Sequence, residues 1–302
     1  MPAQTILAQS FPDKTVRIVI PFAVGGSSDH NSRILQPHLT ERWKQQIVIE
    51  PRPGAASTVG TDYVAKSAPD GYTLLSTSTQ FAYAPATFAH LPYDPLKDLV
   101  PVTLVSISPQ MIIAHPSLPV KNVKELIALA RARPGALNMG NAGSMLASHF
   151  FFMLAKVKIE PVPYKGAGPL LTDLMGGHVP LAMAAISSLQ GAVRQGRAKI
   201  IGVCSLTPSS MFPDAPVIAK DVPGFEAVAW FGLFAPRGTP LDLVRRIRDD
   251  VAAVLQIPDV RKRLNDIGGE PSGLAPDAFA EMVRNEIARW KKVAVAAGVK
   301  PQ

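Results

Sequence analysis

A glycine- and serine-rich segment, Gly25 to Asp29, stands between the apolar run Val16 to Ile20 and a stretch with helical spacing. This order predicts a strand, a loop and the start of a helix. The first turn of a helix leaves backbone N–H groups unpaired at the positive end of the helix dipole, which suits a small anion. The glycines let the backbone approach a ligand closely, and the hydroxyls of Ser27 and Ser28 can donate to a carboxylate. The same residues are also typical of a turn that only caps a helix, so this loop alone does not decide between binding and capping.

Two more polar segments follow predicted strands. The segment Gly140 to Ser144 comes after Leu137 to Met139 and precedes an apolar helical pattern, and the run Ser76 to Gln80 follows Tyr72 to Leu75. Because ligands of open α/β sheets bind at the carboxyl ends of the strands, we expect the three segments to contribute to one site.

The sequence lacks the motifs of nucleotide-binding sites and of a common class of hydrolase. Neither G-x-x-x-x-G-K-[ST] nor G-x-G-x-x-G occurs at these loops, and no G-x-S-x-G nucleophile elbow is present. A serine hydrolase that combines a loop serine with a histidine and an aspartate stays open as an alternative, because residue order alone does not exclude it.

Histidine and cysteine usage predicts no metal site and no cofactor. The six histidines form no i, i+4 pair around an acidic residue, and the single cysteine, Cys204, rules out an internal disulfide and a Cys-x-x-Cys site. The apolar neighbours of Cys204 predict a buried strand position rather than a reactive thiol.

The formal net charge of +8 does not point to nucleic acid as a partner. Basic residues are spread along the chain without interleaved aromatic residues, and the densest stretch, Arg237 to Arg263, has the helical spacing of solvated outer faces. A positive field can still help to collect anionic solutes.

The 302 residues, 47% of them hydrophobic, can form one large core or two ordinary ones. No apolar stretch approaches the roughly 20 residues that a membrane span needs. Residues Met1 to Ser10 lack a basic region and a complete apolar region of a signal peptide, yet Ala8-Gln9 suits the start of a mature exported protein. We therefore expect an exported protein whose leader is not part of this sequence.

Short apolar runs predict strands at Val16 to Ile20, Ile47 to Ile49, Tyr72 to Leu75, Val102 to Ile107, Met111 to Ala114, Val179 to Met183 and Ile200 to Cys204. The helical patterns between them predict an α/β fold with a largely parallel sheet.

Several helices carry start and stop signals. Asn122 with Glu125 predicts a capping box, Thr239-Pro240 predicts another helix start, and the last helix is expected to begin near Pro276. Pro37 is expected to kink or split the helix that starts near Asp29.

The chain resembles a known family, the solute receptors of tripartite tricarboxylate transporters, also called Bug-type receptors. The resemblance covers nearly the whole sequence and rests on the order and spacing of several blocks. These blocks are Phe11 to Lys14, Val16 to Phe22, Gly25 to Asp29, Pro53 to Ala56 with Gly60, Val64 to Lys66, Pro69 to Leu75, Tyr164 to Gly166 with Pro169, Asp173-Leu174 and Gly176-Gly177.

The resemblance implies a type II periplasmic-binding-protein fold, with two lobes and a ligand cleft between them. Domain one then comprises residues 1–104 and 230–302, and residues 105–229 form an inserted domain two, with crossings near Val105 and Ala229. It also implies a monomeric periplasmic receptor that captures a small organic carboxylate and delivers it to integral membrane transporter subunits. A solute sensor for a membrane kinase would share the same binding chemistry and stays open as an alternative.

The resemblance places the ligand carboxylate between the first loop of domain one and the Gly-Ser loop of domain two, partly through ordered waters. Carried onto this chain, it nominates as ligand-binding residues Phe22, Val24, Gly26, Ser27, Ser28, Asp29, Ser78, Thr79, Gln80, Ala142, Gly143 and Ser144. His149 can reach either the cleft or the core and is included among them. Tyr164 and Lys165 are candidates for a second carboxylate, and Asp29 is expected to compensate the helix dipole rather than to act in catalysis.

One departure from the family bears on the ligand. Where members usually carry an aspartate, this chain has Pro180, and no acidic residue occurs between Asp173 and Asp214. An amino-acid ligand would need a carboxylate to neutralise its ammonium group. The sequence therefore favours a dicarboxylate without an amine, with an apolar or aromatic middle against Phe22, Phe81 and the strand around Ala182.

Overall fold

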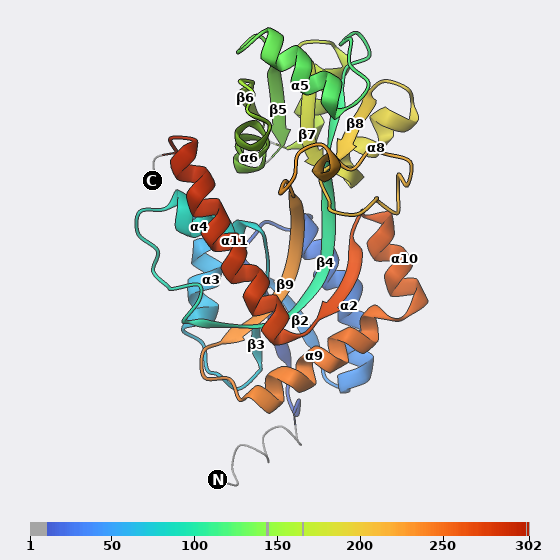
Figure 1. Ribbon diagram of the computed structural model, residues 1–302. Helices are drawn as coiled ribbons and strands as arrows, with labels where there is room; N and C mark the ends of the chain where they lie inside the picture. Colours follow the sequence, from blue (N-terminus) through green and yellow to red (C-terminus); the bar gives the residue numbers. More distant parts are fainter. Residues whose placement is uncertain (1–10, 143–144, 165, 300, 302) are drawn as a thin grey trace. The chain divides into compact units, whose positions relative to one another are not determined.

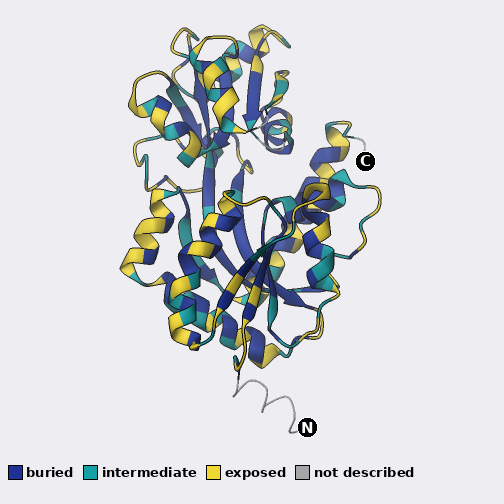
Figure 2. Cartoon of the chain, turned by 180° about the vertical axis from the view of Figure 1, so that it is seen from behind, coloured by how far each residue is buried: buried dark blue, intermediate teal, exposed yellow. Residues whose placement is uncertain are grey.

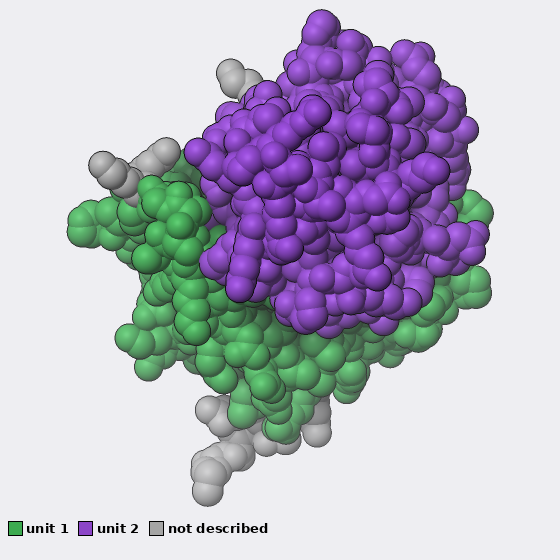
Figure 3. Space-filling view, turned by 45° about the horizontal axis from the view of Figure 1, so that its top comes forward, with its two compact units in different colours: residues 1–107, 230–302 green, residues 108–229 purple. Residues whose placement is uncertain are grey.

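The computed structural model describes residues 11–142, 145–164, 166–299 and 301. The chain divides into two compact units, which Figure 3 colours separately. Unit 1 contains residues 1–107 and 230–302, and unit 2 contains residues 108–229. The unit boundaries fall inside two strands, β4 (Leu99–Ala114) and β9 (Val228–Pro236). Among the described residues, no helix is long and apolar enough to cross a bilayer.

The sheet of unit 1 is mixed. Strand β1 (Val16–Ile20) lies between β2 (Ile47–Pro51) and β3 (Thr73–Ser78) and is parallel to both. Strand β3 pairs with β9, and β10 (Glu270–Leu274) pairs with β4, both antiparallel. Because β1, β2 and β3 are parallel, the helices that follow them, α2 (Ser27–Trp43), α3 (Thr58–Ala65) and α4 (Gln80–Thr87), all start at one edge of this sheet (Figure 1).

The core of unit 1 lies between the strands and the helices α2 and α9 (Leu241–Leu255), with α10 (Pro258–Asp266) beside them. Alternate residues of β1 meet inward residues of α2, among them Leu35, Leu39 and Trp43. The long last helix, α11 (Pro276–Ala296), packs against α4 through the edge-on contact of Tyr83 with Trp290, whose ring centroids are 4.9 Å apart.

The sheet of unit 2 contains three parallel strands, β7 (Leu181–Ala185), β5 (Asn138–Ala142) and β6 (Glu160–Tyr164). The second half of β4 is antiparallel to β7 and to β8 (Lys199–Val203). The helices of this unit are α5 (Val123–Ala132), α6 (Leu146–Ala155), α7 (Ala167–Met175) and α8 (Ile186–Arg194). Figure 2 shows the buried strands of both units in dark blue and the outward helix faces in yellow.

Several local predictions are confirmed. Strand β1 has the predicted bounds, and the Asn122 side chain accepts from the Glu125 backbone N–H at 3.0 Å, while the Glu125 carboxylate accepts from the Lys121 N–H at 2.8 Å. Cys204 is fully buried directly after β8, and burial raises the pKa of its thiol.

Other predictions are wrong. The sheet is mixed rather than largely parallel, and the two predicted strands Val102 to Ile107 and Met111 to Ala114 are one continuous strand, β4. Pro37 does not split α2, which continues to Trp43; Pro37 is exposed, so solvent can hydrate the backbone carbonyl that the missing N–H leaves free. Strands β6, β9 and β10 were not predicted, and prolines in β6 and β10 hide their strand pattern.

Candidate functional site

The start of α2 has the features of an anion-binding helix terminus. Strand β1 ends at Ile20, and after a short loop Gly26 takes an extended conformation (φ −79°, ψ 170°) as the N-cap. No side chain caps the first turn, so its backbone N–H groups are left for solvent or a ligand. Ser27, the first helical residue, is exposed, and Ser28 is buried.

The loop before α2 also presents apolar surface. Val24 is 66% exposed, and Phe22 is half-buried against the core of unit 1. Uncapped N–H groups thus lie in the same segment as an exposed aliphatic side chain, which suits a ligand with a carboxylate and a hydrocarbon part.

Asp29 holds this loop in place. Its Oδ2 accepts from the Gly25 backbone N–H at 3.0 Å, and its Oδ1 accepts from Arg33 Nε at 2.9 Å. Burial of Asp29 acts to raise the pKa of its carboxyl, but the hydrogen bonds from Arg33 and Gly25 outweigh burial and hold that pKa below its ordinary value. The carboxylate is therefore ionised at neutral pH, and both of its oxygens are already paired.

Buried hydrogen bonds fix α2 on the sheet of unit 1. Asn31 donates to the Ser27 carbonyl at 2.8 Å and accepts from Ser106 of β4 at 2.6 Å. Ser32 donates to Ser76 of β3 at 2.8 Å. Sequence reasoning missed these residues, although polar residues at inward positions of a helical pattern were a usable signal.

The third predicted polar segment is not a loop. Strand β3 runs through Ser78, which is half-buried, and Gln80 begins α4. Thr79 is buried as the N-cap residue, and its Oγ1 accepts from the Trp230 backbone N–H at 2.9 Å. Phe81 is fully buried against Tyr93 and Phe234 and has no surface to offer a ligand, which corrects its assignment as an apolar wall.

Helix α3 starts at the same edge and was not predicted to contribute. Before it, Ala55, Ala56 and Ser57 all have positive φ (41°, 48° and 83°), a conformation that is strained for residues with a Cβ. A Cβ at Gly60 would lie 2.9 Å from Pro21 Cα and 2.7 Å from the Arg52 carbonyl oxygen. Gly60 therefore allows α3 to pack directly against the loop after β1.

The second predicted polar segment, Gly140 to Ser144, lies partly inside a strand. Residues Gly140 to Ala142 belong to β5 rather than to a loop, because they pair with β6 and β7. Ala142, the last residue of β5, is half-buried and packs against the core of unit 2. Gly143 and Ser144, both predicted to bind ligand, lie outside the described residues.

Helix α6 begins with an uncharged turn. Met145 is its N-cap residue, no side chain caps it, and the first turn contains no acidic residue. Ser148, the third residue of α6, is buried and hydrogen-bonded to Asn141 of β5. His149 is half-buried, and this burial lowers the pKa of its imidazole while the charge of Glu160 opposes the shift.

The predicted residues for a second carboxylate receive less support. The Tyr164 hydroxyl donates to Asp173 Oδ2 at 2.7 Å, so its proton is used within unit 2. Lys165 lies outside the described residues.

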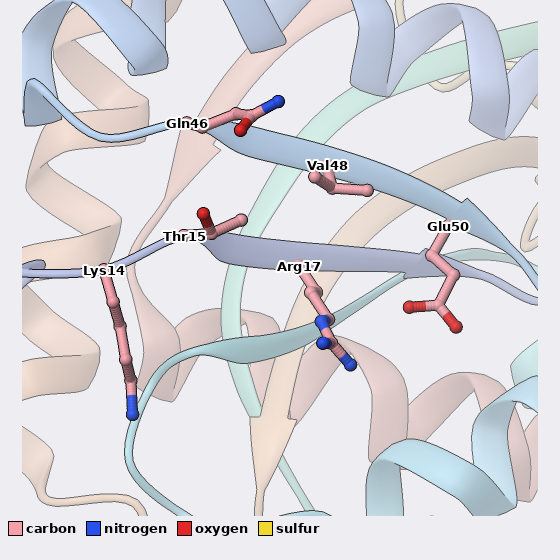
Figure 4. Close-up of a pocket in the computed structure, with 6 residues that line it drawn as sticks. All are labelled: Lys14, Thr15, Arg17, Gln46, Val48 and Glu50. Carbon is pink, nitrogen blue, oxygen red and sulfur yellow. The ribbon is translucent and has the colours of Figure 1, made fainter.

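Outside these helix starts, the described part of the chain offers little for ligand chemistry. Among the described residues, no group of three or more His, Cys, Asp or Glu side chains is arranged to hold a metal ion. A shallow hollow of about 710 Å³ on β1 and β2 (Figure 4) is lined by none of the predicted ligand-binding residues. Its lining consists of Lys14, Thr15, Arg17, Gln46, Val48 and Glu50.

Comparisons with known proteins agree with the fold and with the sequence resemblance. Protein BugT of Bordetella pertussis is 33% identical and covers 99% of this chain and 94% of its own length. Among solved structures, Rpa4515 of R. palustris with adipate has a TM-score of 0.80 at 34% identity and covers 97% of this chain and 100% of its own.

Two more solved structures show the same similarity. MatC from Rhodopseudomonas palustris with bound malate has a TM-score of 0.75 at 35% identity, with coverage of 94% and 100%. The periplasmic binding protein BugD has a TM-score of 0.76 at 30% identity, with coverage of 97% and 100%. These similarities confirm the prediction of a two-lobed periplasmic-binding-protein fold of the α/β class.

Residues 32–299 match the sequence family described as tripartite tricarboxylate transporter family receptor, TctC. The match spans most of the chain and agrees with the Bug-type relatives. The protein therefore belongs to the tripartite tricarboxylate transporter receptor family.

Proposed function

We propose that this protein is a periplasmic receptor that binds a small dicarboxylate and delivers it to the membrane subunits of a tripartite transporter. The observation that carries the proposal is the start of α2, where an uncapped first turn follows the extended Gly26 and lies next to an ionised, fully paired Asp29. Relatives solved with adipate and with malate, and a relative described as periplasmic, support the ligand class and the compartment.

Each helix start has a proposed part in binding. In unit 1, the N–H groups of Gly26, Ser27 and Ser28 donate to a ligand carboxylate, and Phe22 with Val24 contacts its hydrocarbon part. In unit 2, residues 142–144 and His149 supply an uncharged contact. Ser78 and Gln80 keep their proposed role because both are half-buried, whereas Thr79 acts through its hydrogen bond to Trp230.

The structure adds a reason to favour a ligand without an amine. Asp29 is the acidic residue in the first turn of α2, and its two oxygens are paired with Gly25 and Arg33. A ligand ammonium group would have to compete with Arg33 for this carboxylate, at the cost of an ion pair. An uncharged or apolar middle between two carboxylates avoids this competition.

We also propose that the protein is not an enzyme. A serine and a histidine do approach each other at Ser117 and His115, where Oγ lies 2.7 Å from Nδ1. However, Nδ1 already accepts from the Ser117 backbone N–H at 3.2 Å, and both side chains belong to one short turn at the end of β4. This contact is local turn chemistry rather than an activated nucleophile.

A thermal-shift screen tests the ligand class. Adipate, malate, citrate, aspartate and glutamate are compared at equal concentrations. A ligand at about 100 times its dissociation constant adds roughly 2.7 kcal/mol, which raises the melting temperature of a chain of this size by several degrees. We expect dicarboxylates to shift it and amino acids to leave it unchanged. A shift by amino acids alone would overturn the ligand assignment.

Two further assays separate the alternative functions. Turnover of activated esters that disappears in Ser28→Ala would favour a hydrolase. Deletion of the protein separates transport from sensing. A receptor for a transporter is required for uptake of the ligand, whereas a sensor is required for a transcriptional or chemotactic response to it.

A further inference from the structure

Four cationic side chains gather at one corner of unit 2, and the proposed ligand site uses none of them. The corner is formed by the C-terminal ends of α5 and α6 and the first residues of β5 and β6 (Figure 1). We name this surface the basic corner; its cations are Arg131, Arg133, Lys156 and Lys158.

Hydrogen bonds bring these segments together. The Arg131 guanidinium donates to the Ala155 carbonyl at 2.7 Å, next to Lys156. The Gly135 backbone N–H donates to the Lys158 carbonyl at 2.9 Å, and a Cβ at Gly135 would lie 3.5 Å from Lys158 Cε. The two sequence segments, 131–136 and 156–160, therefore form one continuous surface.

The basic corner is largely uncompensated in charge. All four cations are exposed, and among the described residues none of them forms an ion pair with a carboxylate. The two segments contain one acidic residue, Glu160, whose Oε1 also lies near Gly135. The cations of α10 differ, because Lys262 pairs with Asp266 at 2.7 Å and Arg263 with Asp259 at 4.0 Å.

An exposed apolar side chain adjoins the cations. Met153, in the last turn of α6, is 42% exposed, and its carbonyl accepts from the Lys156 backbone N–H at 3.3 Å. Long cationic side chains around a single flexible apolar residue are typical of contacts with a lipid surface. The two segments contain no aromatic residue that could anchor a protein interface.

We propose that the basic corner binds anionic phospholipid headgroups and holds the receptor weakly at the membrane surface that contains its transporter. The inference rests on the proposed function, because a receptor that delivers ligand to membrane subunits must approach a membrane. Each cation near an anionic lipid surface strengthens binding about fivefold, so four cations give weak and reversible association. Such association restricts the search for the transporter to the membrane surface without blocking release.

Sedimentation with lipid vesicles tests the proposal. The full chain is mixed with vesicles of phosphatidylcholine that contain about 30% phosphatidylglycerol, and with vesicles of phosphatidylcholine alone. We expect the protein to sediment with the anionic vesicles at low ionic strength and to be released at about 0.5 M salt. It is not expected to sediment with the neutral vesicles.

Charge-matched variants locate the surface. Lys156→Gln combined with Lys158→Gln is expected to lower the partition coefficient about 25-fold, since two cations are removed. Lys262→Gln combined with Arg263→Gln removes the same charge from α10, where both cations are paired, and is expected to change it less than about twofold. Met153→Ser is expected to weaken binding by a smaller factor.

Three results would overturn the proposal. They are no sedimentation with anionic vesicles, an equal loss in both double variants, and binding to immobilised polyglutamate without binding to vesicles. The last result would identify an acidic protein segment as the occupant. The adipate thermal shift is measured on the same samples, so a failed ligand assignment and a failed membrane contact give different results.

Discussion

Helices α2 and α6 start in corresponding places of their units, each after a strand with parallel neighbours, but their first turns differ in charge. The first turn of α2 contains Asp29, paired with Arg33 and with the loop before the helix. The first turn of α6 contains no acidic residue. We therefore propose that charge in the ligand site is organised by unit 1 and that unit 2 contributes an uncharged surface.

The two helices also differ in the contacts that hold them. Buried hydrogen bonds of Asn31 and Ser32 fix α2. Helix α6 has such a bond between Ser148 and Asn141 of β5, and its Phe150 and Phe151 also pack against Phe225, with ring centroids 5.7 Å and 5.4 Å apart. Because hydrogen bonds are directional, we infer that the backbone donors of α2 are fixed before ligand arrives.

We expect the largest difference between the units when one glycine in each is replaced by alanine and the losses of stability and adipate affinity are compared. In Gly60→Ala, the new Cβ would meet backbone atoms of Pro21 and Arg52 at 2.9 Å and 2.7 Å, which cannot move without shifting the loop before α2. We expect a loss of about 2 kcal/mol in the free energy of unfolding and at least about tenfold weaker adipate binding. Urea unfolding and isothermal titration calorimetry measure both quantities.

The matched change in unit 2 is Gly140→Ala. Its Cβ would meet the end of the Leu170 side chain, which can rotate, and the Tyr164 ring. We expect a smaller loss, about 1 kcal/mol, with little change in adipate affinity. If Gly140→Ala weakened adipate binding more than Gly60→Ala, the division of roles between the units would be wrong.

Substitutions of Asp29 test whether its charge or its hold on the loop before α2 matters for ligand binding. In Asp29→Ala the loop loses its link to the Gly25 N–H, and we expect adipate to bind about tenfold more weakly. Asp29→Asn retains an acceptor for this N–H and is expected to bind within about threefold of the natural protein. Calorimetry at neutral pH compares the two variants, and equal losses in both would mean that the charge matters rather than the loop.

The lowered pKa of Asp29 also has a consequence for acid stability. A carboxyl whose pKa is lower in the folded than in the unfolded chain stabilises the fold above about pH 4, and this contribution is lost as the pH falls through the folded value. Asp29→Asn lacks the contribution of the ionised carboxyl, so the stability of this variant is expected to fall less steeply as the pH drops below about 4. Thermal unfolding between about pH 5 and pH 2 provides the measurement.

The smallest expected effect concerns His149 in α6. Burial lowers the pKa of this imidazole, so the unfolded chain binds the proton more readily and stability falls as the pH drops below about 6.5. His149→Gln is expected to remove this part of the pH dependence. If His149 lies near ligand, adipate should also bind a few-fold more tightly near pH 6 than near pH 7.5 in the natural protein.

The control is the pH dependence of adipate binding in the His149→Gln variant. A pH dependence of adipate binding that persists unchanged in His149→Gln would assign it to other groups, and α6 would then contribute contact surface alone.

Local signals in the sequence were sufficient for part of the fold. The bounds of β1 and the capping box at Asn122 follow from neighbouring residues, and the structure contains both. Strand β6, with Pro161 and Pro163, could not be recognised because its identity depends on parallel pairing with β5, a partner distant in sequence.

At the candidate site, too, local sequence predicted the elements but not their long-range contacts. The glycines and serines before α2 predicted a helix start, and α2 begins there. The contacts that fix this start, Ser32 with Ser76 and Asn31 with Ser106, join residues 44 and 75 positions apart, so inward polar residues in the helical pattern indicate buried contacts but not their partners. The same applies to Gly140, which reads as part of a glycine-rich loop but pairs within β5.

The central claim, that backbone N–H groups of α2 bind the ligand carboxylate, is tested most directly by Ser27→Pro. Proline is tolerated at the first helical position and after an extended residue such as Gly26, so the change removes one N–H and one hydroxyl and leaves the helix intact. Ser27→Ala removes the hydroxyl alone and is the control. The account predicts, by calorimetry, adipate affinity at least about tenfold lower in Ser27→Pro than in Ser27→Ala, with equal melting temperatures of the free proteins. Equal affinities in the two variants would contradict it.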